Sequence, residues 1–168
     1  MSTELVLANM VVGANGATSL HRDSAPLSPP ADRKRFHEIR AMSKALVVGG
    51  NTFRQEHYAR APLPVYVATR RPGPNSGNTT FMNATPSQVV ARALAEIGSA
   101  ILVEGGISFL KPLLENCEID RLFLTRSPIN GDNDFFDFEL LRKNYEIAVS
   151  KKIDDITFEE WIPKNHKL

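Results

Sequence analysis

The sequence predicts one α/β domain with a mostly parallel central sheet, flanking helices and a C-terminal antiparallel hairpin. Three observations lead to this prediction: short apolar segments that end in glycines, amphipathic segments between them, and alternating segments near the C-terminus. A chain of 168 residues, 42% hydrophobic and 23% charged, can bury one ordinary core. Residues 1–168 are therefore expected to form a single domain.

Five segments predict the strands of the sheet. They are short, apolar or alternating, and rich in β-branched residues: residues 4–12, 45–48, 63–69, 100–103 and 120–126. The segments 45–48 (ALVV) and 100–103 (AILV) contain no polar residue. Such runs are typical of parallel strands that are covered on both faces. Residues 13–27, after the first strand, predict a loop.

Amphipathic segments between these strands predict helices. The first helix follows Ser28, whose hydroxyl is expected to cap it. The prolines after Ser28 are compatible with this start, because a proline is tolerated in the first helical turn. Asn51 or Thr52 is expected to cap a short second helix. Residues 86–97 and 107–115 have apolar side chains at helical spacing and predict two longer helices.

The C-terminal segment predicts a β-hairpin over residues 145–161, with its turn near residues 154–155. Alternation places some of its apolar side chains on a face that a small core does not cover; the candidates are Ile147, Val149, Ile153, Ile156, Phe158 and Trp161. Exposed apolar strands tend to be paired or buried. The hairpin therefore predicts a homodimer.

Composition and charge exclude several classes of function. With 20 basic and 19 acidic residues the net charge is +1, which argues against duplex nucleic acid as a partner. The chain has no run of 18 apolar residues and no basic leader, so a cytoplasmic protein without a membrane partner is expected. One cysteine and four scattered histidines predict neither a disulfide nor a metal site.

The most informative motif is Glu104-Gly105-Gly106, which joins a predicted strand to a predicted helix. Glycine lets the backbone approach a ligand closely, and the N–H groups at a helix start favour a phosphate. Ser108 adds a hydroxyl donor, and Glu104 lies at a strand's carboxyl end, where open parallel sheets bind ligands. A glycine turn beside a solvated glutamate is the alternative interpretation.

A second glycine-rich strand end, residues 47–52 (VVGGNT), repeats this arrangement. Two such ends suit a ligand with two phosphates, such as a dinucleotide, although the GxGxxG pattern is absent. Thr69, Arg70 and Arg71 follow another strand. Two guanidinium groups beside a hydroxyl suit a 2′-phosphate, which would select NADPH over NADH. A solvated loop is the alternative for these arginines.

Four stretches together resemble the reductase domain of the bifunctional riboflavin-biosynthesis deaminase/reductase, a relative of dihydrofolate reductase. They are residues 9–16 (NMVVGANG), 35–41 (RFHEIRA) with 45–52, 104–110 (EGGISFL), and 119–131. The resemblance implies a dihydrofolate-reductase-like fold, NADPH as the cofactor and a homodimer. It also implies hydride transfer to the ribosyl carbon of a phosphorylated aminopyrimidine, a small-molecule substrate.

The resemblance further implies the residues of the site. Ser28, Arg40 and Glu104 would face the substrate, and Glu104 together with Asn15 would be the catalytic positions. Proximity and orientation would do most of the catalysis. The residues expected to line NADPH are Val12, Thr52, Glu56, Thr69, Arg70, Arg71, Gly105, Gly106, Ile107, Ser108, Phe109 and Leu110.

One loop departs from the family pattern. Where the family has Ser-Leu-Asp-Gly-Lys, residues 13–17 read Gly-Ala-Asn-Gly-Ala, so a carboxylate and a lysine are absent. Asn15 cannot exchange a proton as a carboxylate does. Two alternatives stay open: a dihydrofolate-reductase-like reductase of another, pterin-like substrate, with Asp32 or Glu38 as its acidic residue, and a nucleotide-binding homologue without turnover.

Overall fold

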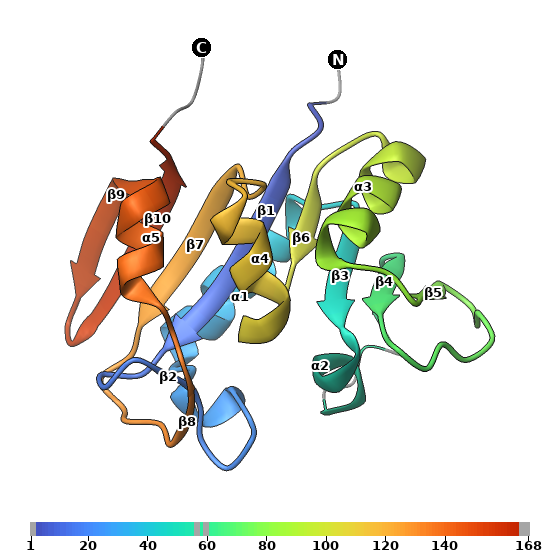
Figure 1. Ribbon diagram of the computed structural model, residues 1–168. Helices are drawn as coiled ribbons and strands as arrows, with labels where there is room; N and C mark the ends of the chain where they lie inside the picture. The colour runs from blue at the N-terminus through green and yellow to red at the C-terminus, as the bar shows by residue number, and fades with distance from the viewer. Residues whose placement is uncertain (1–2, 56–57, 59–60, 165–168) are drawn as a thin grey trace.

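The central sheet of the computed structural model has eight strands in the order β5-β4-β3-β6-β1-β7-β10-β9 (Figure 1). The structure describes residues 3–55, 58 and 61–164. Six strands pair in parallel: β1 Val6–Val12, β3 Ala45–Gly49, β4 Val65–Ala68, β5 Thr79–Met82, β6 Ile101–Val103 and β7 Arg121–Arg126. β10 (Ile156–Pro163) runs antiparallel to β7, and β9 (Tyr145–Ile153) runs antiparallel to β10. The predicted fold class is confirmed.

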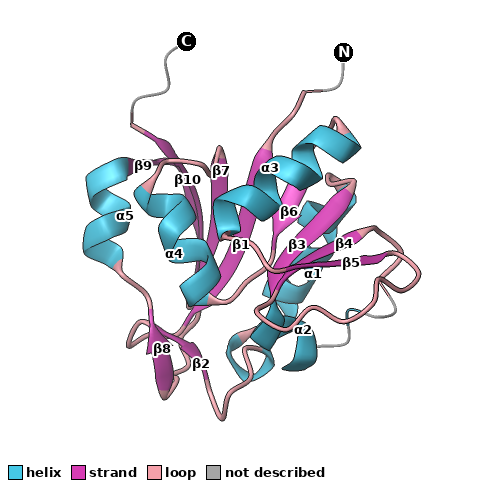
Figure 2. Ribbon diagram, turned by 45° about the vertical axis from the view of Figure 1, so that its right-hand side comes forward, coloured by secondary structure: helices cyan, strands magenta, loops and turns pink. Residues whose placement is uncertain are grey.

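Helices cover both faces of this sheet (Figure 2). α1 (Pro30–Ala41) lies on one face, and α3 (Pro86–Ile97), α4 (Ile107–Glu115) and α5 (Phe138–Asn144) lie on the other. The short helix α2 (Gly50–Gln55) follows directly from β3. This layered arrangement leaves the carboxyl ends of the parallel strands as the place where loops and helix starts converge.

Two hydrophobic clusters, one on each face, explain the apolar strands. In β3, Leu46 and Val48 belong to the cluster that contains Ile39 of α1. Val47 belongs to the cluster on the opposite face, together with Phe109 of α4. All three β3 side chains are fully buried, which is why the strand carries no polar residue.

The ends of α3 have the residues that favour helix caps, whereas α1 and α2 begin at other residues than the sequence predicted. Thr85 and Gln88 form a capping box at the start of α3, and Gly98 ends this helix with φ 60°. In α1 the N-cap position is held by Pro29, so the expected cap at Ser28 is wrong: its hydroxyl donates instead to the Asp32 carboxylate. α2 begins at Gly50, so neither Asn51 nor Thr52 is its cap.

A small second sheet lies in the region that was predicted to be loop. β2 (Ala17–Ser19) pairs with β8 (Asn133–Phe135), and the 3-10 helix η1 (Ala25–Leu27) follows β2. Two glycines permit the close approach: a Cβ at Gly13 would lie 2.5 Å from the Ile129 carbonyl, and one at Gly131 would clash with the Ser19 carbonyl. The exposed β8, together with β5 and α5, was not predicted either.

Candidate cofactor-binding site

A cleft of about 910 Å³ opens where β3, β4 and β6 end. The two glycine-rich strand ends lie side by side here, because β3 pairs with β6 and the Gly49 N–H reaches the Gly105 carbonyl at 3.5 Å. The lining residues come from the end of β3, from α2, from the end of β4 and the loop after it, and from the starts of α3 and α4: Gly49, Gly50, Asn51, Thr52, Arg54, Ala68, Thr69, Arg70, Arg71, Pro86, Gly106, Ser108 and Phe109. No carboxylate is among these described residues.

The turn at Gly105 and Gly106 forms one wall of the cleft. Gly105 has φ 137°, a conformation that side chains rarely adopt. A Cβ at Gly106 would lie 3.1 Å from the Thr52 hydroxyl oxygen, which accepts a hydrogen bond from the Gly106 N–H at 3.1 Å. Within the described residues no side chain caps α4. Its first N–H groups can therefore bind an anion.

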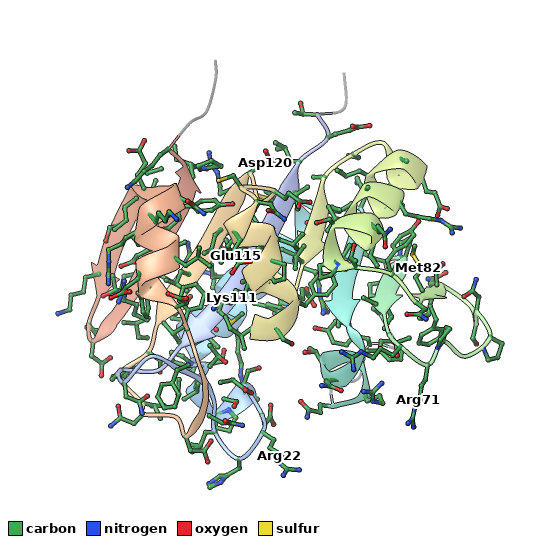
Figure 3. The ribbon with its side chains drawn as sticks, viewed as in Figure 1. Arg22, Arg71, Met82, Lys111, Glu115 and Asp120 are labelled. Atoms are coloured by element: carbon green, nitrogen blue, oxygen red, sulfur yellow. The ribbon has the colours of Figure 1, made fainter. Side chains whose placement is uncertain are left out.

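Three arginines give the cleft its positive charge. Arg70 and Arg71 follow β4, and Arg54 lies on α2. In the part of the chain that the structure describes, none of the three forms an ion pair. Figure 3 shows Arg71 extending outward from the loop after β4. The Thr69 hydroxyl accepts a hydrogen bond from the Arg71 N–H at 3.3 Å.

Glu104 and Arg40 form a bidentate ion pair. Arg40 Nε donates to Glu104 Oε1 at 2.8 Å, and its Nη2 donates to Oε2 at 2.7 Å. The Glu104 side chain is 1% exposed, and that of Arg40 is 25% exposed. The Arg40 guanidinium also lies 4.7 Å from the Phe36 ring centre. The carboxylate is thus covered by α1, and Arg40 is the part of the pair that reaches solvent.

A second arginine, Arg35, fixes α1 on the sheet. Its guanidinium lies between the rings of Phe123 and Phe158, and its Nη2 donates to the Glu159 carbonyl at 3.1 Å. Burial lowers the pKa of Arg35, and the nearby Glu160 and Asp32 carboxylates oppose that shift. Arg35 and Arg40 therefore set the position of α1 and of the residues at its start.

Ser28 and Asp32 meet at the start of α1. The Ser28 hydroxyl donates to Asp32 Oδ2 at 2.5 Å, and Asp32 is only 6% exposed. A carboxylate that is this buried is uncommon unless it has a partner or a function. Ser28 is therefore bonded to a neighbour in its own segment.

Asn15 connects two loops through its side-chain amide. Its Nδ2 donates to the Gly131 carbonyl at 2.9 Å, and its Oδ1 accepts from the Gly131 N–H at 3.1 Å. The same Oδ1 accepts from the Ala17 N–H at 3.3 Å. An amide can donate and accept in this way, whereas an ionised carboxylate only accepts. The amide at this position is thus matched to the backbone of the second loop.

The family model described as the RibD C-terminal domain matches residues 5–154. The chain belongs to this family. It is a family of NADPH-dependent reductases. No curated protein matches the chain. Within the described residues, no helix is long and apolar enough to cross a membrane, and no group of three His, Cys, Asp or Glu side chains could hold a metal ion.

Three solved structures resemble this member of the RibD C-terminal domain family, each with a TM-score of 0.73. Dihydrofolate reductase from Enterococcus faecalis, complexed with NADP(H) and RAB-propyl, is 21% identical, with 96% of this chain and 97% of that chain covered. A putative riboflavin biosynthesis protein from Shewanella sp. PV-4 is 18% identical, with 95% and 99% covered. The Thermotoga maritima diaminohydroxyphosphoribosylaminopyrimidine deaminase/5-amino-6-(5-phosphoribosylamino)uracil reductase is 13% identical, and the match covers 95% of this chain but 56% of that one. These likenesses support the fold.

The structure brings most of the expected cofactor residues into the cleft. Thr52, Thr69, Arg70, Arg71, Gly106, Ser108 and Phe109 line it. Gly105 is buried in the turn and Ile107 is half-buried, while Val12 and Leu110 are 1% exposed and belong to the hydrophobic core. Glu56 lies outside the described residues.

Gly49, Gly50 and Asn51 belong to the second glycine-rich strand end, whereas three lining residues lie outside every motif that the sequence indicated: Arg54, Ala68 and Pro86. Arg54 had a signal, since it follows Gly50 by four residues and a short helix was expected there. One helical turn brings such a residue back beside the glycine. The other two are uncharged and carry no comparable pattern.

Proposed function

We propose that this protein is a cytoplasmic NADPH-dependent reductase that reduces the ribosyl chain of 5-amino-6-(5-phosphoribosylamino)uracil to a ribityl chain. One observation carries the proposal: among the described residues, the cleft is lined by a glycine turn at the start of α4 and by three arginines, with no carboxylate. Its volume of about 910 Å³ is at the upper end of the range for small-molecule sites, which suits a dinucleotide.

The residues of the cleft fit the polar parts of NADPH. Gly106 allows the pyrophosphate to approach the backbone, and a side chain would occupy that space. Thr52 and Thr69 each accept a backbone N–H bond, so their own hydroxyl protons can point to phosphate oxygens. When bound, NADPH supplies the hydride.

On the substrate side, Glu104 acts as a positioning residue through Arg40. Since the carboxylate is 1% exposed, it holds the guanidinium in one orientation rather than contacting the substrate itself. Arg40 then offers a charge-assisted contact to the phosphorylated substrate, and Ser28 lies at the start of the same helix. Asn15 holds the β1–β2 loop, and orientation lowers the barrier more than proton transfer does.

NADPH oxidation followed at 340 nm tests the proposal. We expect oxidation with 5-amino-6-(5-phosphoribosylamino)uracil and none without a second substrate. Oxidation with dihydrofolate instead would favour the pterin-like alternative. NADPH binding without turnover of either compound, or of small carbonyl compounds, would refute the reductase function. The protein would then be a nucleotide-binding protein.

The pterin-like alternative is favoured by Asp32. This carboxylate lies on the inward face of α1 and is 6% exposed, as an acidic residue that pairs with a buried heterocycle would be. Asp32→Asn separates the two substrates. It should abolish a dihydrofolate activity, whereas the aminopyrimidine activity, which depends on Arg40, should fall less.

We also propose a homodimer that forms through the edge strand β9. Ile147, Val149 and Ile153 are 47%, 47% and 41% exposed on this strand, which has a partner on one side only. Light scattering at micromolar concentration should give twice the chain mass, and Val149→Lys should shift it to the monomer. A monomeric wild-type protein would refute this mode of assembly.

A further inference from the structure

Arg54 and Thr69 converge on one corner of the cleft, above Gly50. A Cβ built on Gly50 would lie 3.1 Å from Arg54 Nη1 and 3.1 Å from Thr69 Oγ1. The guanidinium from α2 and the hydroxyl of the residue after β4 therefore border the same space above Gly50. Only a glycine at position 50 leaves this space between them.

The Arg54 side chain is held in this corner by its neighbour. Arg54 starts from the last turn of α2 but folds back along the helix, and its Nη2 donates to Asn51 Oδ1. Across the described residues, no carboxylate forms an ion pair with it. Within the described residues the corner thus has an oriented positive charge without a carboxylate partner, which suits a bidentate contact to a phosphate.

The Thr69 hydroxyl completes the corner as a donor. Its oxygen accepts the Arg71 N–H at 3.3 Å, so its proton is available to a ligand. This corner is formed by other residues than the glycine turn, where Thr52 contacts Gly106. The cleft therefore offers two separate anion positions, one for a diphosphate at the turn and one for a phosphate monoester beside β4.

The arginines after β4 are placed differently. Arg70 and Arg71 belong to the exposed loop, and Figure 3 shows the Arg71 side chain directed away from the body of the protein. Among the described residues, no side chain forms a hydrogen bond or ion pair with either guanidinium. A side chain that must be ordered on binding contributes less than one already held in place.

We propose that Arg54, with Thr69, forms the phosphomonoester subsite by which the protein distinguishes NADPH from NADH, and that Arg70 and Arg71 contribute less. This assignment rests on the proposed function, since it names the specificity residues of the same cleft. It also changes the sequence-based expectation, which gave the 2′-phosphate to Arg70 and Arg71.

Fluorescence titration of the full chain with NADPH and NADH tests the assignment. Arg54→Gln should weaken NADPH binding about tenfold or more and leave NADH binding within about twofold, because it removes one charge-assisted contact. Thr69→Val should weaken NADPH binding by a smaller factor in the same direction. 2′-AMP should compete with NADPH on the wild type and much less on Arg54→Gln.

Arg121→Gln is the matched control. Arg121 is the first residue of β7, and its neighbour in sequence, Asp120, lies at the end of the molecule opposite Arg71 in Figure 3. The Arg121→Gln substitution should therefore change neither dissociation constant. If Arg54→Gln keeps the wild-type ratio of NADH to NADPH dissociation constants, or if only Arg71→Gln lowers it, the assignment is wrong while the cofactor proposal stands. If the wild type binds neither nucleotide, the proposed function is wrong and the assignment falls with it.

Discussion

The proposed site has a cofactor half and a substrate half, and these differ in how their polar side chains are bonded. In the cofactor half, at the ends of β3, β4 and β6, Arg54, Arg70 and Arg71 have no ion-pair partner within the described residues. In the substrate half, Glu104 is paired with Arg40, and Ser28 with Asp32. The first half is prepared to receive an anion, whereas the second is a bonded framework that fixes α1.

This difference determines whether a substitution in each half acts on the ligand directly or through a contact within the protein. In the cofactor half, a substitution should act on the ligand directly, because the arginines there form no ion pair within the described residues. In the substrate half, a change first disturbs a contact within the protein and reaches the substrate through it. Binding and turnover should therefore respond separately to substitutions in the two halves.

The largest effect is expected in the cofactor half, from Gly106→Val. Even a Cβ here would lie 3.1 Å from the Thr52 hydroxyl, and the two methyl groups of valine would occupy the space that a pyrophosphate needs. We expect NADPH affinity to fall more than about a hundredfold, measured by fluorescence titration, because several phosphate hydrogen bonds are lost.

The control for this variant is Gly73→Val. Gly73 lies in the loop after β4, two residues beyond Arg71, and a Cβ there would have no atom within 4 Å. Circular dichroism should show both variants folded. Unchanged NADPH affinity in a folded Gly106→Val protein would exclude the glycine turn as the pyrophosphate position.

The next largest effect is expected in the substrate half, from Glu104→Gln. The amide keeps the shape but removes the charge that holds Arg40, so turnover should fall about ten- to a hundredfold. NADPH binding should stay nearly intact, since Glu104 does not line the cleft. Steady-state kinetics and nucleotide titration on the same preparation measure the two effects.

A parallel loss of NADPH affinity and turnover in Glu104→Gln would remove the distinction between the halves. Arg40→Lys is a useful companion variant, because lysine keeps the charge but cannot form the bidentate pair. It should reproduce most of the turnover loss. Wild-type turnover in both variants would show that the pair is structural only.

The sequence predicts the cofactor half better than the substrate half, for a physical reason. Gly105, Gly106 and Thr69 stand at strand ends, and the ends of parallel strands meet at one edge, so position along the chain is enough to bring them together. The pairing of Arg40 with Glu104 depends on how α1 lies across the sheet. No local pattern in the sequence encodes that angle.

The strands also differ in how well the sequence predicts them. Parallel strands such as residues 45–49 are visible because both faces are buried. β8 is exposed at all its residues, and it forms only because Gly13 and Gly131 let two distant loops approach. The family resemblance placed Asn15 at a catalytic position, but no local pattern indicates its bonds to Gly131, because they span 116 residues of sequence.

The smallest predicted effect concerns this loop contact. Asn15→Asp removes the donor to the Gly131 carbonyl and places a charged oxygen beside it. We expect the free energy of unfolding in urea to fall by about 1 kcal/mol. Asn78→Asp, on another exposed loop, should change it by less than about 0.5 kcal/mol. Equal stability of Asn15→Asp and the wild type would show that the amide does not hold the two loops together.

A crystal structure of the protein with NADPH would show whether the cleft between α2 and α4 holds the cofactor. We expect pyrophosphate oxygens within about 3.2 Å of the N–H groups at the start of α4. We also expect the 2′-phosphate beside Arg54 and Thr69, and the nicotinamide directed toward the side of the sheet where Arg40 and Glu104 lie. A nucleotide bound with its phosphates elsewhere, or no nucleotide in a crystal grown at saturating NADPH, would contradict this expectation.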